Sequence, residues 1–260
     1  MVKLLETIRL ENGRFYNLTF HQERMNNSRK ELFGYDDEID LVSILQAGNA
    51  KKNAGSHPSK SRFYGFLSCR QAHVLRSSGF AIRTQRATDL QSENSGIENP
   101  KTLNFQIANL KERKGIFKCR IIYSKEIEEI EFVPYQLPNI NTLKVVTDEQ
   151  ISYEHKYLDR NQLDQLFQQK ENCDDILIVR NNLVTDTFFA NIIFYNGTDW
   201  VTPARPLLKG TQRASLLEKR VIKTADIRIQ DLKSFEKARL INAMIRFEDE
   251  IEIEVGSFLF

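Results

Sequence analysis

The stretch DDILIVRNNLVTDTFFANIIF, residues 174–194, decides the fold class. It holds three short apolar runs, at 175–180, 183–186 and 190–195, whose length and β-branched content are typical of strands. No helix-length segment separates these runs, so they do not form the regular β-α-β alternation of a doubly wound sheet. Helical patterns appear only further out on either side. We therefore predict an α+β fold.

The rest of the chain extends this mixture of elements. Asn12-Gly13 and Asn196-Gly197 each separate two strand-like runs and predict hairpin turns. The patterning predicts further strands at 3–11, 14–18, 116–123, 127–133, 143–151, 200–202, 227–230 and 251–255, and helices at 21–33, 156–169, 211–223 and near 232–238.

Two breaks in the pattern predict the domain organisation. Pro134 and Pro138 interrupt the strand pattern, so we expect a linker at 134–142 between a small α+β domain, 1–135, and a larger cofactor-binding domain, 143–260. We expect the small domain to carry an insertion or flexible segment at 46–100, which is rich in Ser, Asn, Gln and Gly. Within it, 51–86 contains eight Lys and Arg residues and no Asp or Glu. This segment is either a solvated loop or a basic arm that contacts nucleic acid or an acidic partner.

Composition excludes several classes of protein. The 260 residues include 37 Lys and Arg against 35 Asp and Glu, and this near balance argues against a dedicated nucleic-acid binder. No apolar run approaches the roughly 18 residues that span a bilayer. Three widely spaced cysteines, an odd number, argue against a disulfide framework and indicate a cytoplasmic protein. Cys69 and His73 are only two ligands, so we expect no metal site.

Three segments carry residues that point to chemistry. Lys156, in HKYLDR at 155–160, lies where a strand and loop give way to a helix, and Asp186 closes a strand. Gly210 precedes a helix start, where free backbone N–H groups can bind a phosphate. A lysine for a Schiff base, a carboxylate for a protonated pyridine nitrogen and a phosphate cradle together match the needs of pyridoxal 5′-phosphate (PLP).

Several segments, in order, resemble the class IV PLP-dependent aminotransferases. This family includes branched-chain and D-amino-acid aminotransferases and aminodeoxychorismate lyase. The similar segments are LETIRLENGRFYNLTFHQERMNNS at 5–28, HKYLDRNQL at 155–163, DDILIVRNNLVTDTFFANIIF at 174–194, WVTPARPLLKGTQR at 200–213 and LINAMI at 240–245. The resemblance implies the two-domain, D-amino-acid aminotransferase-like fold and a homodimer with active sites near the subunit interface.

The resemblance also implies residue roles. Lys156 would be the Schiff-base lysine and would carry the proton at the substrate α-carbon. Arg24 would contact the cofactor phosphate, and Asp186 would pair with the pyridine nitrogen. The backbone N–H groups of Thr211 and Gln212 would bind the phosphate as well. Arg9, in the first strand, would face the substrate and help to bind a carboxylate.

Two kinds of function remain open at this point. The chain would be a PLP-dependent enzyme acting on an amino acid or an amino-chorismate, either an aminotransferase or a lyase of the aminodeoxychorismate type. The Lys-x-x-(Asn/Asp)-Arg pattern at Lys156 leans toward the lyase. The alternative is a non-catalytic relative that uses the basic segment 51–86 for binding, although the presence of Lys156 argues against it.

Overall fold

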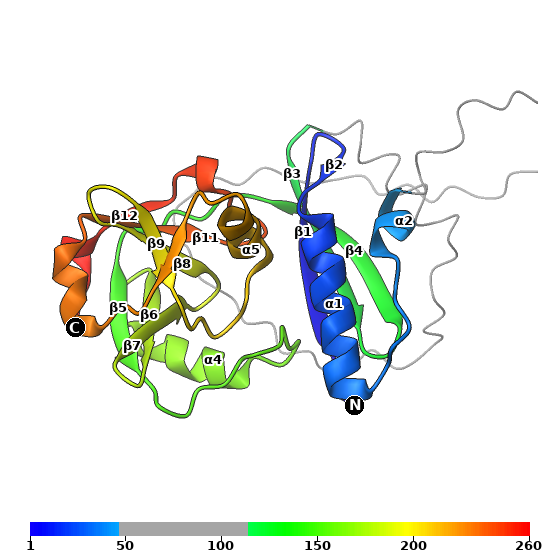
Figure 1. The fold of residues 1–260 in the computed structure, drawn as a ribbon, viewed down its shortest axis with the longest axis horizontal. Helices are drawn as coiled ribbons and strands as arrows, with labels where there is room; N and C mark the ends of the chain where they lie inside the picture. The colour runs from blue at the N-terminus through cyan, green and yellow to red at the C-terminus, as the bar shows by residue number, and fades with distance from the viewer. Residues whose placement is uncertain (47–113) are drawn as a thin grey trace, which may run out of the picture. The chain divides into compact units, whose positions relative to one another are not determined.

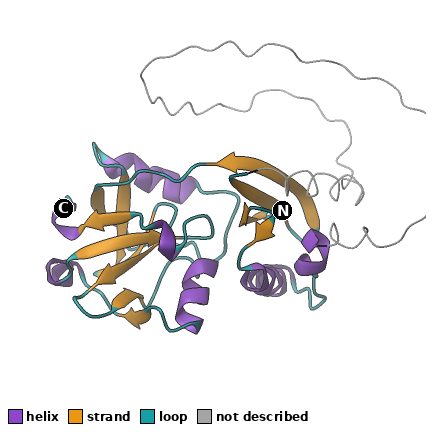
Figure 2. Ribbon diagram, turned by 90° about the horizontal axis from the view of Figure 1, so that it is seen from above, coloured by secondary structure: helices purple, strands orange, loops and turns teal. Residues whose placement is uncertain are grey.

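The structure, a computed structural model, describes residues 1–46 and 114–260 (Figure 1). Most of the predicted insertion therefore lies outside the described residues, including the basic segment 51–86 and the Cys69–His73 pair. The described residues form helices and three separate β-sheets. Figure 2 shows the helices in purple and the strands in orange. The predicted α+β class is confirmed. The predicted boundary at 134–142 stays a prediction.

The first sheet is antiparallel and has the strand order β2-β1-β3-β4. Its elements are β1 (Leu4–Glu11), β2 (Arg14–Phe15), α1 (Leu18–Phe33), α2 (Leu41–Gln46), β3 (Ile116–Tyr123) and β4 (Ile127–Tyr135). Asn12 and Gly13 both have positive φ angles, 50° and 75°, as the predicted hairpin turn requires. Apolar side chains of α1, such as Leu18 and Met25, pack against the sheet in one buried cluster.

The strand β4 runs further than the sequence indicated. Pro134 pairs with Phe117 inside the ladder, although we expected the linker to begin there. The reason is that β4 lies at the edge of its sheet. In an edge strand, a proline whose nitrogen faces away from the neighbouring strand removes no hydrogen bond from the ladder.

The other two sheets have the orders β5-β6-β7 and β10-β9-β8-β11-β12. Their strands are β5 (Leu143–Thr147), β6 (Asp175–Arg180), β7 (Leu183–Thr187), β8 (Asn191–Tyr195), β9 (Trp200–Pro203), β10 (Lys223–Ala225), β11 (Lys237–Ile241) and β12 (Glu252–Glu254). Two helices accompany them, α4 (Asn161–Phe167) and α5 (Thr211–Glu218). Asn181 and Asn182, with φ of 53° and 60°, form the tight turn between β6 and β7.

Four predictions about elements were wrong. Lys156 lies in a loop five residues before α4, and not at the start of a helix over 156–169. The helix from 211 ends at Glu218 because Arg220 adopts a left-handed conformation, φ 56°. Residues 229–234 form a 3-10 helix where part of a strand was expected, and the strand lies earlier, in β10. The strand β11 was missed because its pairing partners, β8 and β12, are distant in sequence.

The loop that carries Lys156 is attached to the first strand of the chain. The backbone N–H of Leu5 donates to the carbonyl of Lys156 at 2.9 Å, and the N–H of Leu158 donates to the carbonyl of Lys3 at 2.9 Å. Leu4 and Tyr157 pair as an isolated antiparallel bridge between these bonds. The backbone position of Lys156 is therefore fixed by residues 3–5.

Candidate active site

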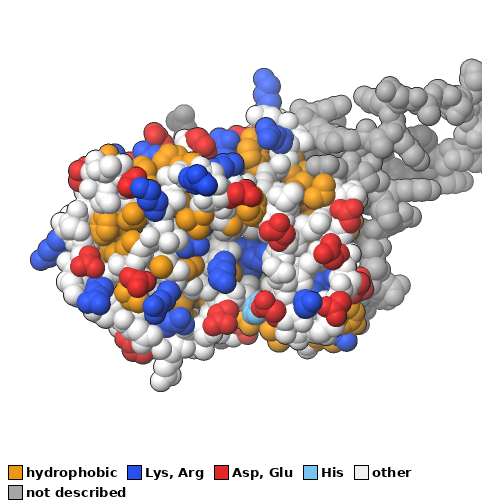
Figure 3. Space-filling view, viewed as in Figure 1, with side chains coloured by type: hydrophobic (Ala, Val, Ile, Leu, Met, Phe, Trp, Pro, Cys, Tyr) orange, Lys and Arg blue, Asp and Glu red, His pale blue; other side chains and the backbone are white. Residues whose placement is uncertain are grey.

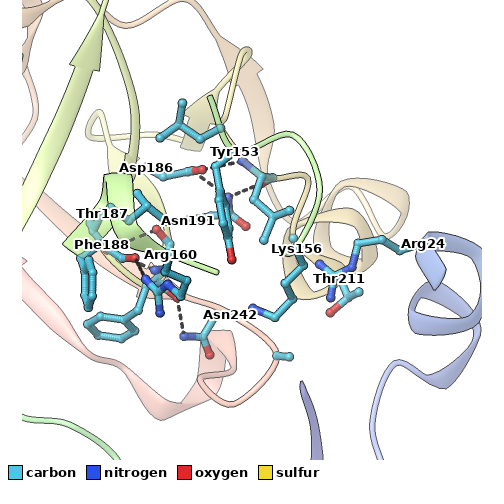
Figure 4. A pocket seen from close by; sticks show the side chains of 17 residues that line it. Arg24, Tyr153, Lys156, Arg160, Asp186, Thr187, Phe188, Asn191, Thr211 and Asn242 are labelled. Carbon is cyan, nitrogen blue, oxygen red and sulfur yellow. Dashed lines mark hydrogen bonds between the residues drawn. The ribbon is translucent and has the colours of Figure 1, made fainter. Parts of the chain in front are cut away.

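A cavity brings together four of the residues singled out from the sequence. Arg24, Lys156, Asp186 and Thr211 all line it (Figure 4). The remaining lining residues come from the loop and helix at 153–163, from 187–191, from the turn at 207–210 and from residues 242 and 243. The cavity thus joins α1, the Lys156 loop, the end of β7 and the start of α5.

Lys156 is partly buried at this cavity, and its amine is easier to deprotonate than that of an ordinary lysine. Burial, together with the nearby Arg24 cation, lowers the pKa of Lys156 to about 7, although the Glu6 carboxylate acts in the opposite direction. A lysine with this pKa has a substantial fraction of neutral amine at neutral pH. It can therefore act as a nucleophile and as a proton carrier.

Asp186 is a buried carboxylate held in one orientation. Its Oδ1 accepts a hydrogen bond from Asn191 Nδ2 at 2.7 Å, and its Oδ2 accepts one from the Leu208 N–H at 2.9 Å. Burial raises the pKa of Asp186 to about 6, although these two hydrogen bonds oppose the shift. The group is mostly ionised at neutral pH, so the cavity contains a fixed anion suited to a protonated ring nitrogen.

Because Gly210 has no side chain, the side-chain amide of Asn191 can lie next to it and donate a hydrogen bond to Asp186. A Cβ atom at Gly210 would lie 2.0 Å from Asn191 Oδ1. We expect Gly210→Ala to displace Asn191 and to lower the free energy of unfolding by about 1–3 kcal/mol, the cost of a broken buried hydrogen bond to a charged group. Urea denaturation would measure this loss. Gly256→Ala is the matched control, because a Cβ there meets nothing within 4 Å, and equal losses in both variants would contradict the prediction.

Glu6 organises the side of the cavity formed by α1. It is completely buried and accepts hydrogen bonds from Arg24 Nε at 2.9 Å and Arg24 Nη2 at 2.6 Å. Burial alone would raise the pKa of Glu6, but the Arg24 cation and the hydrogen bond with His21 outweigh it and lower the pKa to about 2. Arg24 is thereby fixed as a cation beside the cavity.

His21 links Glu6 to the start of α5. Burial lowers the pKa of His21, so the ring is neutral at neutral pH. The ionised Glu6 lies 2.5 Å from Nδ1, which assigns the proton to that nitrogen. Nε2 then accepts the Thr211 hydroxyl at 3.1 Å. A chain of hydrogen bonds thus runs from Glu6 through His21 to Thr211.

The start of α5 supplies donors for an anion. The first N–H groups of an α-helix have no partner within the helix, and α5 begins at Thr211, which lines the cavity. Arg24 lies at the same place and its Nη1 is 3.4 Å from the Lys209 carbonyl. Free N–H groups and a guanidinium together are the partners that a phosphate prefers.

Two of the predicted residues are placed differently. Gln212 is not among the lining residues, and its buried side chain accepts a hydrogen bond from Asn17 at 2.7 Å, so only its backbone could serve an anion. Arg9 does not line the cavity either. Its buried guanidinium donates to the Met244 carbonyl at 2.8 Å and forms an ion pair with Asp249. The expected contact between Arg9 and a substrate carboxylate has no support in this arrangement.

Three residues of the site, Glu6, Asn191 and Arg160, received no role from the sequence. Glu6 lies on the inward face of β1, and a charged residue at an alternating apolar position was a signal that could have been used. Arg160 entered only as part of the Lys-x-x-(Asn/Asp)-Arg pattern, and Asn191 gave no signal. Asn191 is one polar residue at the start of a strand, and its role depends on a turn 17 residues away.

The described ranges 1–46 and 114–260 contain no helix that is long and apolar enough to cross a membrane. They contain no group of three or more His, Cys, Asp or Glu side chains arranged to hold a metal ion. On the face shown in Figure 3, the described Lys and Arg side chains are mixed with Asp and Glu.

Comparison with known proteins agrees with the chemistry of this cavity. Residues 121–247 match the family model of the class IV aminotransferases. This segment contains Lys156, Asp186, Thr211 and Gln212, whereas Arg9 and Arg24 precede it. The family is PLP-dependent.

The similarity to known proteins extends over almost the whole chain. An uncharacterized protein of Haemophilus influenzae is 29% identical over 94% of this chain and 98% of its own length. The crystal structure of a candidate 4-amino-4-deoxychorismate lyase from Haemophilus somnus 129pt is 29% identical, covers 95% of this chain and 98% of its own, and has a TM-score of 0.66. A hypothetical aminotransferase from Mycobacterium tuberculosis in a PLP-bound form is 14% identical, covers 99% and 81%, and has a TM-score of 0.62. The class IV aminotransferase fold predicted from the sequence is thereby confirmed.

Proposed function

We propose that this protein is a PLP-dependent enzyme that acts on an amino-group substrate, with Lys156 as its Schiff-base lysine. One observation carries the proposal. A lysine whose pKa is about 7 shares a cavity with a buried carboxylate, Asp186, and with the Arg24 cation beside the start of α5. Ionisable side chains with shifted pKa values that share one cavity indicate a catalytic site.

The residues present fit this cofactor. PLP has an aldehyde, a basic ring nitrogen and a doubly anionic phosphate, and the cavity offers a partner for each. Asp186 is an anion fixed by two hydrogen bonds, as a protonated ring nitrogen requires. Arg24 and the first N–H groups of α5 would hold the phosphate.

The protein's own groups have distinct tasks in the proposed reaction. PLP, when bound, supplies an aldehyde and an electron-withdrawing ring that stabilises negative charge at the substrate α-carbon. Lys156, as a neutral amine, would bond to a carbonyl carbon with loss of water. Once the substrate amine had displaced it, the freed amine would accept the proton from the carbon that bears the substrate nitrogen. A positioned base of this kind contributes about 10²–10⁴-fold to the rate. Asp186 holds a proton at the ring nitrogen, and Arg24 fixes the phosphate.

A visible absorbance spectrum tests the proposal. Purified wild-type protein mixed with PLP is expected to show a visible band that borohydride removes, after which the peptide containing Lys156 carries the reduced cofactor. Lys156→Ala should show neither the band nor the labelled peptide. Folded wild-type protein without a band would contradict the proposal. It would favour the non-catalytic alternative, in which the basic segment 51–86 serves binding.

Within this family we favour elimination over amino-group exchange. The relative with 29% identity over 95% of this chain is a candidate 4-amino-4-deoxychorismate lyase, and Lys156 is followed by Asp159 and Arg160 in the pattern noted above. Release of pyruvate from aminodeoxychorismate would support a lyase. Exchange of an amino group between an amino acid and a 2-oxo acid, without pyruvate release, would support an aminotransferase instead.

We also propose that the protein is a cytoplasmic homodimer. The support is the family resemblance, which implies subunits with active sites near their interface. One chain has a mass of 30.3 kDa, and light scattering of the full chain should give twice that mass. A monomer with full activity would contradict this proposal and would leave the cofactor proposal intact.

A further inference from the structure

Arg160 is a cavity residue whose position is fixed from two sides. Its guanidinium lies over the Phe188 ring, 4.2 Å from the ring centroid, and its Nη2 donates to the Phe188 carbonyl at 2.5 Å. Figure 4 shows it in the cavity with Lys156 and Asn242. A planar cation held by stacking and by a backbone carbonyl is already oriented before any ligand arrives.

The charge of Arg160 has no carboxylate partner in the described part of the chain. Its Nε is buried and has no hydrogen-bond partner there, and no ion pair involves this residue. Arg24, the other arginine of the cavity, is instead neutralised by Glu6. A cavity cation that keeps unused hydrogen-bond donors is a binding partner for an anionic group of a ligand.

Asp175 is a buried acid whose pKa is influenced by Arg160, and it does not neutralise this arginine. Burial raises the pKa of Asp175 to about 7, and the Arg160 cation is the smallest of the influences that oppose this shift. Asp175 is therefore partly protonated at neutral pH. One of its oxygens, Oδ2, is also buried without a partner, which shows that the two groups do not form a hydrogen-bonded pair.

Arg160 also lies where two cavities meet. Together with Tyr153 and Leu163 it lines the cavity of Lys156 and a neighbouring cavity formed by residues 1–3 and 152–163. A molecule in the neighbouring cavity would therefore also lie beside Arg160. This position suits a residue that holds one end of a substrate while the other end reaches Lys156.

We propose that Arg160 binds a carboxylate of the substrate, so that the enzyme selects amines that also carry a carboxylate. The inference rests on the proposed function, in which the enzyme acts on the amino group of its substrate. It gives Arg160 the role that the family resemblance implied for Arg9. The carboxylate supplies the acceptor that Arg160 lacks within the protein. Arg160 is on this view a specificity residue that contacts the substrate directly.

Calorimetric binding to full-length protein, with and without PLP, tests the proposal. The probes are 4-aminobenzoate against aniline, and D- and L-alanine against ethylamine, so that each acid is paired with an amine that lacks the carboxylate. Wild type should prefer at least one acid of the set to its amine. Arg160→Gln should weaken binding of that acid by about 10–100-fold and leave the amine unchanged, because it removes one charge-assisted contact. Arg160→Lys should recover part of the loss.

The controls separate this proposal from the proposed function. Arg205→Gln removes the same charge at a side chain that is 71% exposed and should leave acid binding unchanged. Retention of the PLP band in Arg160→Gln shows that the cofactor site is intact. If PLP does not bind but the acid preference still depends on Arg160, only the proposed function fails. No acid preference in wild type, or equal loss for acids and amines in Arg160→Gln, would overturn the role of Arg160.

Discussion

Turnover by Lys156→Ala is expected to fall by more than about 10⁴-fold, the upper range for one positioned proton-transfer group. The loss is larger than for any other single change because the same amine serves as nucleophile and as proton carrier. Lys156→Arg keeps a cation but should be equally inactive, since a guanidinium does not lose its proton in a protein. Steady-state kinetics on cofactor-saturated protein measure the loss. Lys233→Ala, at an exposed lysine, is the matched control and should retain full turnover.

The pH dependence of PLP uptake tests the lowered pKa of the Lys156 amine. Burial and the Arg24 cation lower the pKa of Lys156 from the ordinary value of 10.5 to about 7. The reactive neutral form therefore accumulates as the pH rises through about 7, and it is nearly complete above that value. The rate of PLP uptake by wild-type protein should rise over this window and then level off. A rate that continues to rise toward pH 10 would show that Lys156 titrates as an ordinary lysine.

Glu6→Ala is expected to give the largest loss of stability, about 3–5 kcal/mol of the free energy of unfolding, as for other broken buried ion pairs. The substitution leaves Arg24 without its counter-ion and His21 Nδ1 without its acceptor. It also empties the space of a completely buried side chain. Urea denaturation of the cofactor-free protein, followed by circular dichroism, measures the change.

An exposed ion pair and the pH dependence of the free energy of unfolding serve as controls for the Glu6 prediction. Glu128 pairs with Lys3 at 2.6 Å in an exposed position, so Glu128→Ala should cost less than about 1 kcal/mol. The folded-state pKa of Glu6, about 2, lies below its ordinary value of 4.5. Its charge therefore stabilises the fold above pH 4.5, and this contribution is lost as the pH falls toward 2. A Glu6→Ala variant no less stable than Glu128→Ala, or a difference independent of pH, would contradict the assignment.

The sequence predicted the elements whose signals are local. The hairpin at Asn12-Gly13 follows from two residues that accept positive φ angles, and the α+β class follows from short strands without regular helical connections. The cavity residues Lys156 and Asp186 also stood out in short segments, since one lies in a loop and the other near the end of a strand, whereas Thr211 was implied only by the family resemblance. These are the places where polar side chains commonly serve function.

The parts that could not be predicted depend on contacts between distant segments. The strand β11 is defined by its partners β8 and β12, and its own five residues carry no clear period. At the sequence level, the family resemblance offered Arg9 for a substrate carboxylate and gave Arg160 no such role. Only the folded chain shows that Arg9 is paired with Asp249, 240 residues away, whereas Arg160 reaches the cavity.

The bridge between Leu4 and Tyr157 limits how this protein can be divided or recombined. A fragment starting at residue 143 would contain Lys156, Asp186 and Thr211 but would lack Arg24 and the backbone partners of the Lys156 loop. A chimera that joins the first 46 residues of one homologue to the second half of another would have to preserve the alignment of Leu4 with Tyr157. A slip of one residue there would change the direction in which the reactive amine points. The two halves of the chain therefore depend on each other and form one catalytic unit.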